Sequence, residues 1–402
     1  MRNHPATSYV PKQPIGGDER LHSLDILRGL ALLGMILVHF HQKTRLELGG
    51  VDDLIGWAVY IFVEQKAWGT FAFLFGVGFA ILLRRLERRG TAVISTYLRR
   101  MVALAVFGVV AEVCFGFHIL FSYACWGLVL LLIRGWSTSA LLVTAAIAAS
   151  ARSVVGELLL LTSAGSAPPA NAPLARAVQA ATQQSNYLTL LEARWALFAG
   201  SFPHTWRELL PDINLALFIL GLLAVRHGVV DAPMAQVRRI TRWMALGALA
   251  WACSWLVLLQ LSRVGIEAHW PVVLGFGLVQ DQWLCLTYIG ATLLLLAYRP
   301  AWVTRLALFG YAGRMALTNY MVQAAILDAL SSAYGWGLRL RPLVYLPAAV
   351  VLFGVVASCS RAWLMRFRIG PLEWLWRMAT YAAPQPLRRN RASLNAAPLR
   401  YR

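Results

Sequence analysis

The sixteen residues LDILRGLALLGMILVH, from Leu24 to His39, place an Asp, an Arg and a His in an otherwise apolar segment. A transmembrane helix takes about 20 mostly apolar residues, and an ionisable side chain at the bilayer centre costs at least about 2.5 kcal/mol. Asp25 and Arg28 lie one turn apart on one helix face, so they can neutralise each other. His39 then lies near the opposite membrane surface. We therefore predict a membrane-spanning helix that carries a functional site.

The composition of the rest of the chain agrees with a membrane protein. Of the 402 residues, 59% are hydrophobic and only 14% are charged, which excludes an ordinary soluble domain. A net charge of +19 would by itself suit nucleic-acid binding, but the arginines lie between apolar segments, where the positive-inside rule explains them. We predict an all-α, polytopic membrane protein, with the lipid bilayer and not nucleic acid as its partner.

The apolar runs predict about ten transmembrane helices. Arginines follow the second, sixth and eighth runs, and they place both termini in the cytoplasm, although Arg339 and Arg341 oppose this orientation. Residues 54–63 are interpreted as an interfacial or re-entrant helix. The predicted spans are residues 24–41, 67–83, 101–121, 122–134, 138–162, 212–228, 243–262, 272–298, 308–330 and 343–364.

The same pattern divides the chain into five regions. Residues 1–20 are predicted to be a disordered cytoplasmic head, and residues 382–402 a basic cytoplasmic tail. Residues 21–162 and 212–381 form the N-terminal and C-terminal transmembrane bundles. The extracytoplasmic loop between them, residues 163–211, begins rich in Ala, Pro and Ser and is interpreted as a flexible lid.

Three histidines are predicted to lie at the extracytoplasmic side. His39 and His41 end the first span, and His118 ends the third. Imidazole at such a place can act as general base on a hydroxyl or amine, or accept an acyl group. The alternative is a helix cap or an interfacial side chain, and for His39 we favour the catalytic role.

Asp25 and Arg28 also have two interpretations. They either belong to the catalytic site or lock the first helix to its neighbours at the cytoplasmic surface. The lock predicts that substitution lowers the protein level, whereas a catalytic role predicts a normal level and lost activity.

A second polar set lies in the later spans. Glu112 is either a buried proton carrier or the partner of an Arg or Tyr from another helix. Asn319 and Gln323 share a helix face, and they either line a cavity or hydrogen bond to a neighbouring helix, which is the commoner use. With Asp281 they are candidates for binding substrate, and Asp328 is a further intramembrane carboxylate.

No motif indicates a metal or a nucleotide loop. Cys114 and His118 lie one turn apart but have no second ligand pair nearby in the sequence, so no metal site is predicted. The glycines of LFGVGF, Leu74 to Phe79, lie inside an apolar span and predict close helix packing.

Several stretches resemble the YeiB-like family of bacterial membrane proteins, also called domain-of-unknown-function family 418. The resemblance covers most of the chain outside the extracytoplasmic loop, and it implies a multi-span inner-membrane protein without an established substrate. The stretches are RLHSLDILRGLALLGMILVH (Arg20 to His39), KAWGTFAFLFGVGFA (Lys66 to Ala80), LFILGLLAVRHGV (Leu217 to Val229), GRMALTNYMVQ (Gly313 to Gln323), YGWGL (Tyr334 to Leu338) and FRIGPLEWLWRMATY (Phe367 to Tyr381).

The first stretch also resembles the opening helix of transmembrane acyltransferases, of both the heparan-glucosaminide acetyltransferase type and the acyltransferase-3 type. In the latter pattern an LDxLRG segment ends in a catalytic His, which corresponds to His39, whereas YeiB-like chains more often have Asn. The third span departs from the family, which usually has Asp-Ile-Leu before Tyr-Ala. Here the sequence is His118-Ile119-Leu120 and then Tyr123-Ala124, so either His118 replaces the Asp or the function has changed.

These observations predict a membrane-embedded acyltransferase. It would take an acyl group from a cytoplasmic thioester such as acyl-CoA and deliver it to an extracytoplasmic hydroxyl or amine of a small molecule or glycan. Acyl-CoA would be a co-substrate, and no tightly bound cofactor is predicted. His39 would be the base or acyl carrier. Arg28 and the cluster at 84–89 would attract donor phosphates, although topology alone also explains that cluster.

Two other classes of protein remain as alternatives. One is a transporter or permease with Glu112, Asp281 and Asp328 as ligands near the midplane, and the other is an envelope scaffold. Replacing His39 separates the first two hypotheses, because an enzyme would lose acyl transfer and a transporter would keep its flux.

Overall fold

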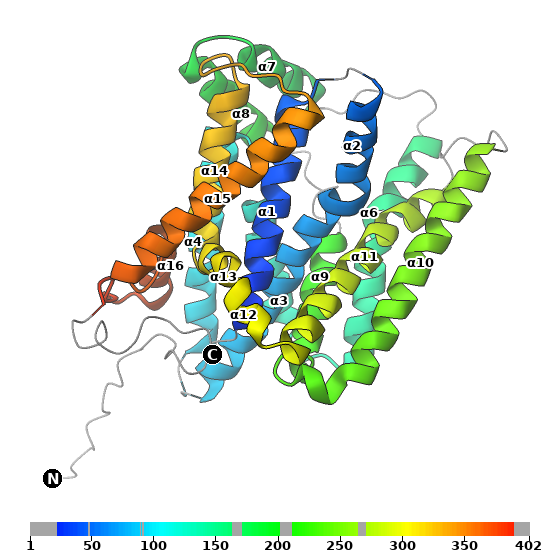
Figure 1. The fold of residues 1–402 in the computed structure, drawn as a ribbon, viewed down its shortest axis with the longest axis vertical. Helices are drawn as coiled ribbons and strands as arrows, with labels where there is room; N and C mark the ends of the chain where they lie inside the picture. Colours follow the sequence, from blue (N-terminus) through cyan, green and yellow to red (C-terminus); the bar gives the residue numbers. More distant parts are fainter. Residues whose placement is uncertain are drawn as a thin grey trace.

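The computed structural model describes residues 22–46, 49–88, 90, 92–162, 171–201, 211–263 and 271–389. Within these residues the chain is all-helical apart from two isolated bridges, Arg45 with Leu340 and Phe367 with Arg388, so the predicted all-α class is confirmed. The helices (Figure 1) are α1 His22–Thr44, α2 Val51–Val59, α3 Gln65–Arg88, α4 Val93–Phe115, α5 Ile119–Ile133, α6 Thr138–Thr162, α7 Ala172–Thr182, α8 Tyr187–Ser201, α9 Ile213–Arg226, α10 Val237–Arg263, α11 Pro271–Tyr298, α12 Ala301–Arg305, α13 Ala307–Arg314, α14 Ala316–Ser331, α15 Pro342–Arg366 and α16 Pro371–Tyr381.

Helix α1 lies at the centre of the bundle, in contact with α3 and with α13, α14 and α15 (Figure 1). Two glycines explain how closely it approaches α13. A Cβ on Gly29 would overlap the backbone of Phe309, and a Cβ on Gly313 would overlap the backbone of Asp25. Small residues at both positions therefore let the two helix backbones touch.

Helices α3 and α9 approach each other in the same way. A Cβ on Gly76 would overlap the carbonyl of Phe218, and a Cβ on Gly221 would overlap the backbone of Phe73. The predicted packing role of the LFGVGF glycines is thus confirmed for Gly76. Gly78 has nothing within 4 Å of its Cβ position, because it faces the cavity described below.

Two boundaries differ from the predicted spans. Helix α4 ends at Phe115 because Gly116 adopts a left-handed conformation, with φ of 73°. His118 consequently lies in the turn before α5 and not inside a span at 101–121. The predicted span at 308–330 is also broken, since α13 ends at Arg314 and α14 begins at Ala316.

Residues 54–63 do not form a separate interfacial helix. Helix α2 continues through a π-helical turn, Tyr60–Glu64, directly into α3. The result is one helical segment of 38 residues, Val51–Arg88. Such π-helical turns are rare inside α-helices and occur frequently at functional sites.

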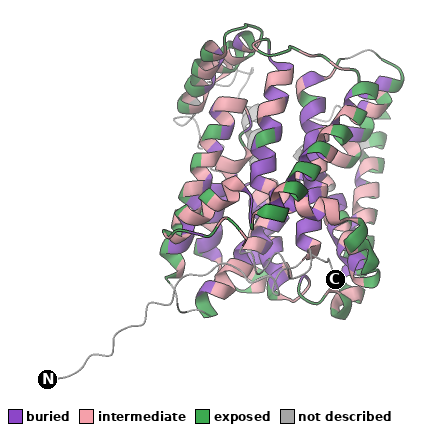
Figure 2. Cartoon of the chain, turned by 60° about the vertical axis from the view of Figure 1, so that its left-hand side comes forward, coloured by how far each residue is buried: buried purple, intermediate pink, exposed green. Residues whose placement is uncertain are grey.

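Four helical segments of the described chain are long and apolar enough to cross a membrane: His22–Thr44, Val51–Arg88, Pro233–Val257 and Pro342–Arg366. Their burial differs sharply. The apolar window of the first is 72% buried inside the protein, whereas that of Pro233–Val257 is 17% buried. Figure 2 shows buried residues gathered on the inner helices and exposed ones on the periphery. These features fit a helical membrane protein with apolar side chains on its outer surface.

The described part of the predicted extracytoplasmic loop is helical. Residues 163–170 and 202–210 lie outside the described residues, but α7 and α8 between them form a helical hairpin at the top of the bundle (Figure 1). The Ala333 amide donates a 3.0 Å hydrogen bond to the carbonyl of Thr182. Arg194 anchors α8 to Asp328 of α14. The predicted head at 1–20 lies outside the described residues, as do residues 390–402 of the predicted tail.

Candidate functional site

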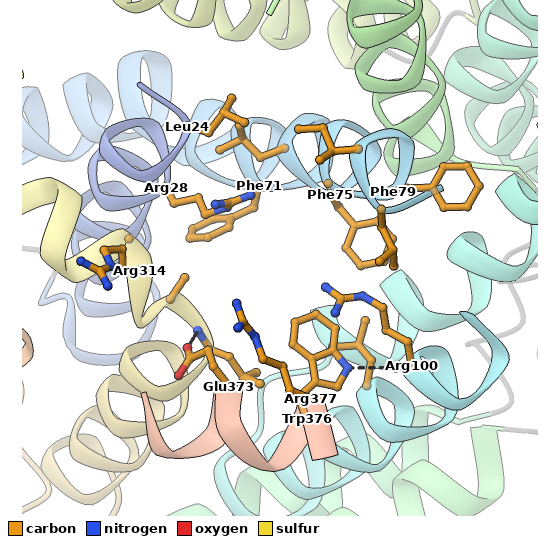
Figure 3. Close-up of a pocket in the computed structure, with 18 of the residues that line it drawn as sticks. Leu24, Arg28, Phe71, Phe75, Phe79, Arg100, Arg314, Glu373, Trp376 and Arg377 are labelled. Atoms are coloured by element: carbon orange, nitrogen blue, oxygen red, sulfur yellow. Dashed lines mark hydrogen bonds between the residues drawn. The ribbon is translucent and has the colours of Figure 1, made fainter. Parts of the chain in front are cut away.

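A cavity of about 710 Å³ lies between α1, α3, α4, α14 and α16, and Figure 3 shows it in close-up. We call it the arginine cavity, because among the described residues its wall has eight arginines and three carboxylates, Asp25, Asp231 and Glu373. The arginines are Arg28, Arg84, Arg85, Arg88, Arg100, Arg314, Arg368 and Arg377. Such an excess of guanidinium groups favours an anionic ligand.

Two of the carboxylates already pair with arginines. Asp25 Oδ1 accepts a 3.0 Å bond from Arg28, which confirms the predicted neutralisation within α1. Arg84 donates a 2.8 Å bond to Asp231. The Asp25 carbonyl lies against Gly313 of α13, and the Asp25 side chain lines the cavity.

The third carboxylate, Glu373, has a structural partner at the start of α14. Its side chain accepts bonds from the backbone amides of Leu317 (2.7 Å) and Thr318 (3.0 Å), and from the Thr318 hydroxyl (2.6 Å). A carboxylate there complements the positive end of a helix dipole. Burial raises the pKa of Glu373, and the hydrogen bonds from Thr318 and Leu317 oppose the rise.

Arg100 and Arg377 point toward the open centre of the cavity, together with Arg28 (Figure 3). The guanidinium of Arg100 lies 3.7 Å from the ring centroid of Trp376, and the Trp376 indole donates a 2.9 Å bond to the Arg100 carbonyl. This contact joins α16 to α4 and fixes one cation at the wall.

The other part of the wall is apolar and aromatic. Phe71, Phe75 and Phe79 follow one another at four-residue intervals on α3, so they share the face that lines the cavity. Met35 of α1 and Tyr320 of α14 also contribute to the wall. The arrangement suits an amphiphilic ligand that has an anionic head and an apolar or neutral arm.

His39, the predicted catalytic base, does not line this cavity. It lies one helical turn beyond Met35 and is only 3% exposed. Its ring centroid is 4.1 Å from that of Phe117 and 6.2 Å from that of Tyr320. Its Nδ1 atom has no hydrogen-bond partner among the described residues. Tyr320 is thus both a neighbour of His39 and a residue of the cavity wall.

The side chains of the three predicted histidines do not all lie together. His118 is exposed and lies close enough to His39 for an electrostatic interaction, as does Lys43. His41 instead faces α15, where its Nδ1 lies 2.7 Å from the Tyr345 hydroxyl. The structure thus brings His39 and His118 together and gives His41 a packing role.

Asn319 and Gln323 have different environments although they share a helix face. The Asn319 amide nitrogen lies 2.9 Å from both the Ala312 carbonyl and the Ser360 hydroxyl, so Asn319 joins α13, α14 and α15. Gln323 is fully buried, and neither polar atom of its side chain has a hydrogen-bond partner among the described residues. Neither residue lines the arginine cavity.

The remaining predicted carboxylates lie apart from the cavity. Asp281 forms an ion pair with Lys66, which is 2% exposed. Asp328 accepts bonds of 2.9 and 2.6 Å from Arg194 and is fully buried. Glu112 is near enough to Tyr320 for an electrostatic interaction.

Sequence reasoning missed several residues of this site. Trp376 and Arg377 were not predicted as site residues because α16 is too short to span a bilayer, and Arg100 of α4 was assigned only to the arginines that set the topology. The signal was available in the amphipathic pattern LEWLWRM, Leu372 to Met378, which places aromatic and basic residues together. Lys66 and Arg194 were also missed, since each pairs with a carboxylate far away in the chain.

The fold and cavity define a helical membrane-protein bundle that encloses an arginine-rich, partly aromatic cavity. The chain belongs to the YeiB-like family. Residues 224–383 match the family model described as "Protein of unknown function (DUF418)". Residues 20–170 match the model described as "Heparan-alpha-glucosaminide N-acetyltransferase, catalytic".

Similar proteins support the family assignment. The uncharacterized protein YxaH of Bacillus subtilis (strain 168) is 31% identical over 413 residues, covering 93% of this chain and 98% of YxaH. An uncharacterized 39.9 kDa protein of Bacillus acidopullulyticus is 28% identical, covering 93% of this chain and 97% of its own length. The uncharacterized protein YeiB of Escherichia coli (strain K12) is 39% identical over 74 residues, which cover 18% of this chain and 19% of YeiB. No solved structure matches the chain significantly.

Proposed function

We propose that this protein is a membrane-embedded acyltransferase. It takes an acyl group from a cytoplasmic acyl-CoA and delivers it to a hydroxyl or amine of a small molecule or glycan outside the inner membrane. The observation that carries the proposal is the arginine cavity, which combines eight arginines with an aromatic wall that approaches His39. The match of residues 20–170 to an N-acetyltransferase catalytic model supports the same class of reaction.

The proposed membrane topology of the protein has ten spans, with both termini in the cytoplasm. The arginine end of the cavity then faces the cytoplasm, where acyl-CoA is available, and the α7–α8 hairpin faces the opposite side. Arginine forks bind phosphate oxygens in bidentate geometry, so Arg28, Arg100 and Arg377 would hold the donor phosphates. The pantetheine arm and the thioester would lie along Phe71 and Phe75.

His39 acts as the general base in this proposal. It accepts a proton from the acceptor hydroxyl or amine while the acceptor oxygen or nitrogen attacks the thioester carbon. The carbon–sulfur bond then breaks, and the proton passes to the departing thiolate. For this step a path must open between the cavity and His39, which is buried, and Tyr320 is the cavity residue whose ring neighbours His39.

The decisive experiment supplies acetyl-CoA labelled in the acetyl group to sealed inside-out membrane vesicles. We expect label to appear on an envelope component with the unaltered protein. We expect His39→Ala, at equal protein level, to lower the transfer rate by about 10²- to 10⁴-fold, the usual contribution of a general base. A matched His41→Ala variant should retain transfer, since His41 faces Tyr345. Absence of label from every envelope component would contradict the proposal.

A transporter remains the second candidate, and the partly buried Lys66–Asp281 ion pair is the observation that favours it. Intramembrane ion pairs commonly mark solute or proton pathways. Solute flux that survives His39→Ala but is lost on Asp281→Asn would support this candidate in place of the enzyme.

A further inference from the structure

Phe117 covers His39 on the side of the α7–α8 hairpin. The Phe117 ring lies 4.1 Å from the His39 ring, centroid to centroid, and the Lys43 ammonium lies 4.8 Å from the same Phe117 centroid. His39 and Lys43 are one turn apart on α1, so a single aromatic ring contacts both levels of that helix. Phe117 is itself only 7% exposed.

The backbone holds Phe117 in this position. Gly116 ends α4 with a φ of 73°, which side-chain-bearing residues rarely adopt, and the Phe117 amide donates a 3.2 Å bond back to the Ala111 carbonyl. A Cβ on Gly116 would lie 3.2 Å from Lys43 Nζ and 3.3 Å from an Arg194 nitrogen. The turn therefore directs Phe117 toward α1 and leaves room for the two cations above it.

Beyond Phe117 the environment becomes polar. Asp328 pairs with Arg194, accepts a 3.0 Å bond from the Tyr334 hydroxyl and lies 3.9 Å from Lys43 Nζ. We call Lys43, Arg194, Asp328 and Tyr334 the outer polar cluster. The Lys43 side chain is 27% exposed, whereas His39 is 3% exposed. Within the cluster Lys43 and Tyr334 are partly exposed, whereas Arg194 and Asp328 are buried. The Phe117 ring contacts both the partly exposed Lys43 and the buried His39.

We propose that Phe117 controls access to His39 from the α7–α8 side, where the acyl acceptor would enter. It separates His39 from the outer polar cluster, and its side chain must rotate away before a hydroxyl or amine from the α7–α8 side can reach the imidazole. That the entering molecule is an acyl acceptor rests on the proposed function, whereas the barrier that Phe117 forms in front of His39 does not. The contrasting interpretation is that Phe117 is only part of the apolar core with Met35 and Tyr320, in which case its removal lowers stability without opening a route.

The test measures the accessibility of position 39 to a thiol reagent. All five native cysteines are replaced by serine or alanine, and His39→Cys is introduced as the reporter. The probe is the membrane-impermeant 2-sulfonatoethyl methanethiosulfonate, added to sealed vesicles. Ser185→Cys in the exposed α7–α8 turn identifies the vesicle orientation in which the reagent reaches the hairpin side, so the test does not depend on the proposed topology.

We expect the His39→Cys reporter to react slowly in that orientation. Adding Phe117→Ala should accelerate labelling at least tenfold, whereas adding Phe115→Ala, which removes a ring from the same apolar cluster, should leave the rate unchanged. The Ser185→Cys rate corrects for differences in reagent access to the hairpin side, and thermal unfolding in detergent checks that each variant is folded. If Phe117→Ala lowers the amount of folded protein, Phe117→Leu should give a smaller acceleration in the same direction.

Two results would overturn the proposal. One is equal labelling of the reporter with and without the Phe117 substitutions, and the other is a reporter that already reacts as fast as Ser185→Cys. Because labelling reports access and not chemistry, the barrier can be established even if no acyl transfer is found. Conversely, acyl transfer can be present while the barrier is refuted, so the two proposals fail separately.

Discussion

The two ends of α1 differ in openness and in charge, although one helix forms both. At one end Asp25 and Arg28 line a cavity of about 710 Å³ whose wall is rich in arginine. At the other end His39 is 3% exposed and packs against aromatic rings. One helix therefore lines an open cavity at one end and buries its candidate base at the other. Catalysis would then require motion only at the His39 end.

The largest effect is expected from breaking the ion pair that holds α8 over the His39 end. Asp328→Asn leaves Arg194, whose side chain is 4% exposed, without its counter-charge, and breaking a buried pair costs about 3–5 kcal/mol. Thermal unfolding in detergent should show a clear fall in Tm. The control, Asp231→Asn, breaks the half-exposed Arg84–Asp231 pair at the cavity and should cost no more than about 1 kcal/mol. Equal shifts in the two variants would refute the contrast between the ends.

A somewhat smaller effect is expected at the arginine end from Gly313→Ala. The added methyl would overlap the Asp25 backbone, and overpacking of this kind costs about 1–3 kcal/mol. We expect less folded protein on size-exclusion chromatography. Gly78→Ala, at a position with nothing within 4 Å of its Cβ, is the matched control. A stable Gly313→Ala protein would mean that α1 and α13 do not need their close approach.

Arg377→Gln tests whether the charge of the cavity binds ligand. Loss of a hydrogen bond to a charged group costs about 1.5–3 kcal/mol, so the Kd for acetyl-CoA should rise roughly 10- to 100-fold. Isothermal titration calorimetry on the purified protein measures this directly. Arg361→Gln, an exposed arginine of α15 that does not line the cavity, should bind as the unaltered protein does. Unchanged affinity in Arg377→Gln would remove Arg377 from the donor site.

The smallest effect concerns the pH dependence of stability at Glu373. Burial raises the pKa of this carboxyl above its ordinary value of 4.5, so the folded state favours the protonated form. The resulting contribution to stability is fully present below pH 4.5 and declines as the pH rises through the folded-state pKa. Glu373→Gln should flatten the slope of Tm against pH over this range, whereas the exposed Glu192→Gln should not. An unchanged slope in Glu373→Gln would contradict this account.

Local signals in the sequence account for part of the structure. The Asp25–Arg28 pair and the packing of Gly76 follow from helical spacing and side-chain size, which a single segment displays. The joining role of Asn319 was one of two interpretations that spacing allowed. The Arg194–Asp328 and Lys66–Asp281 pairs could not be derived, because each joins helices more than 130 positions apart in the chain. The closure of His39 by Phe117 depends on the turn conformation of Gly116, which periodicity does not reveal.

The most direct test of the account is a structure determined with acetyl-CoA bound. We expect the phosphates of the ligand to contact Arg28, Arg100 and Arg377, and the thioester to lie beside Tyr320, on the path to His39. Acetyl-CoA bound elsewhere on the protein, or an arginine cavity without ligand at saturating acetyl-CoA, would contradict the proposal that this cavity is the donor site of an acyltransferase.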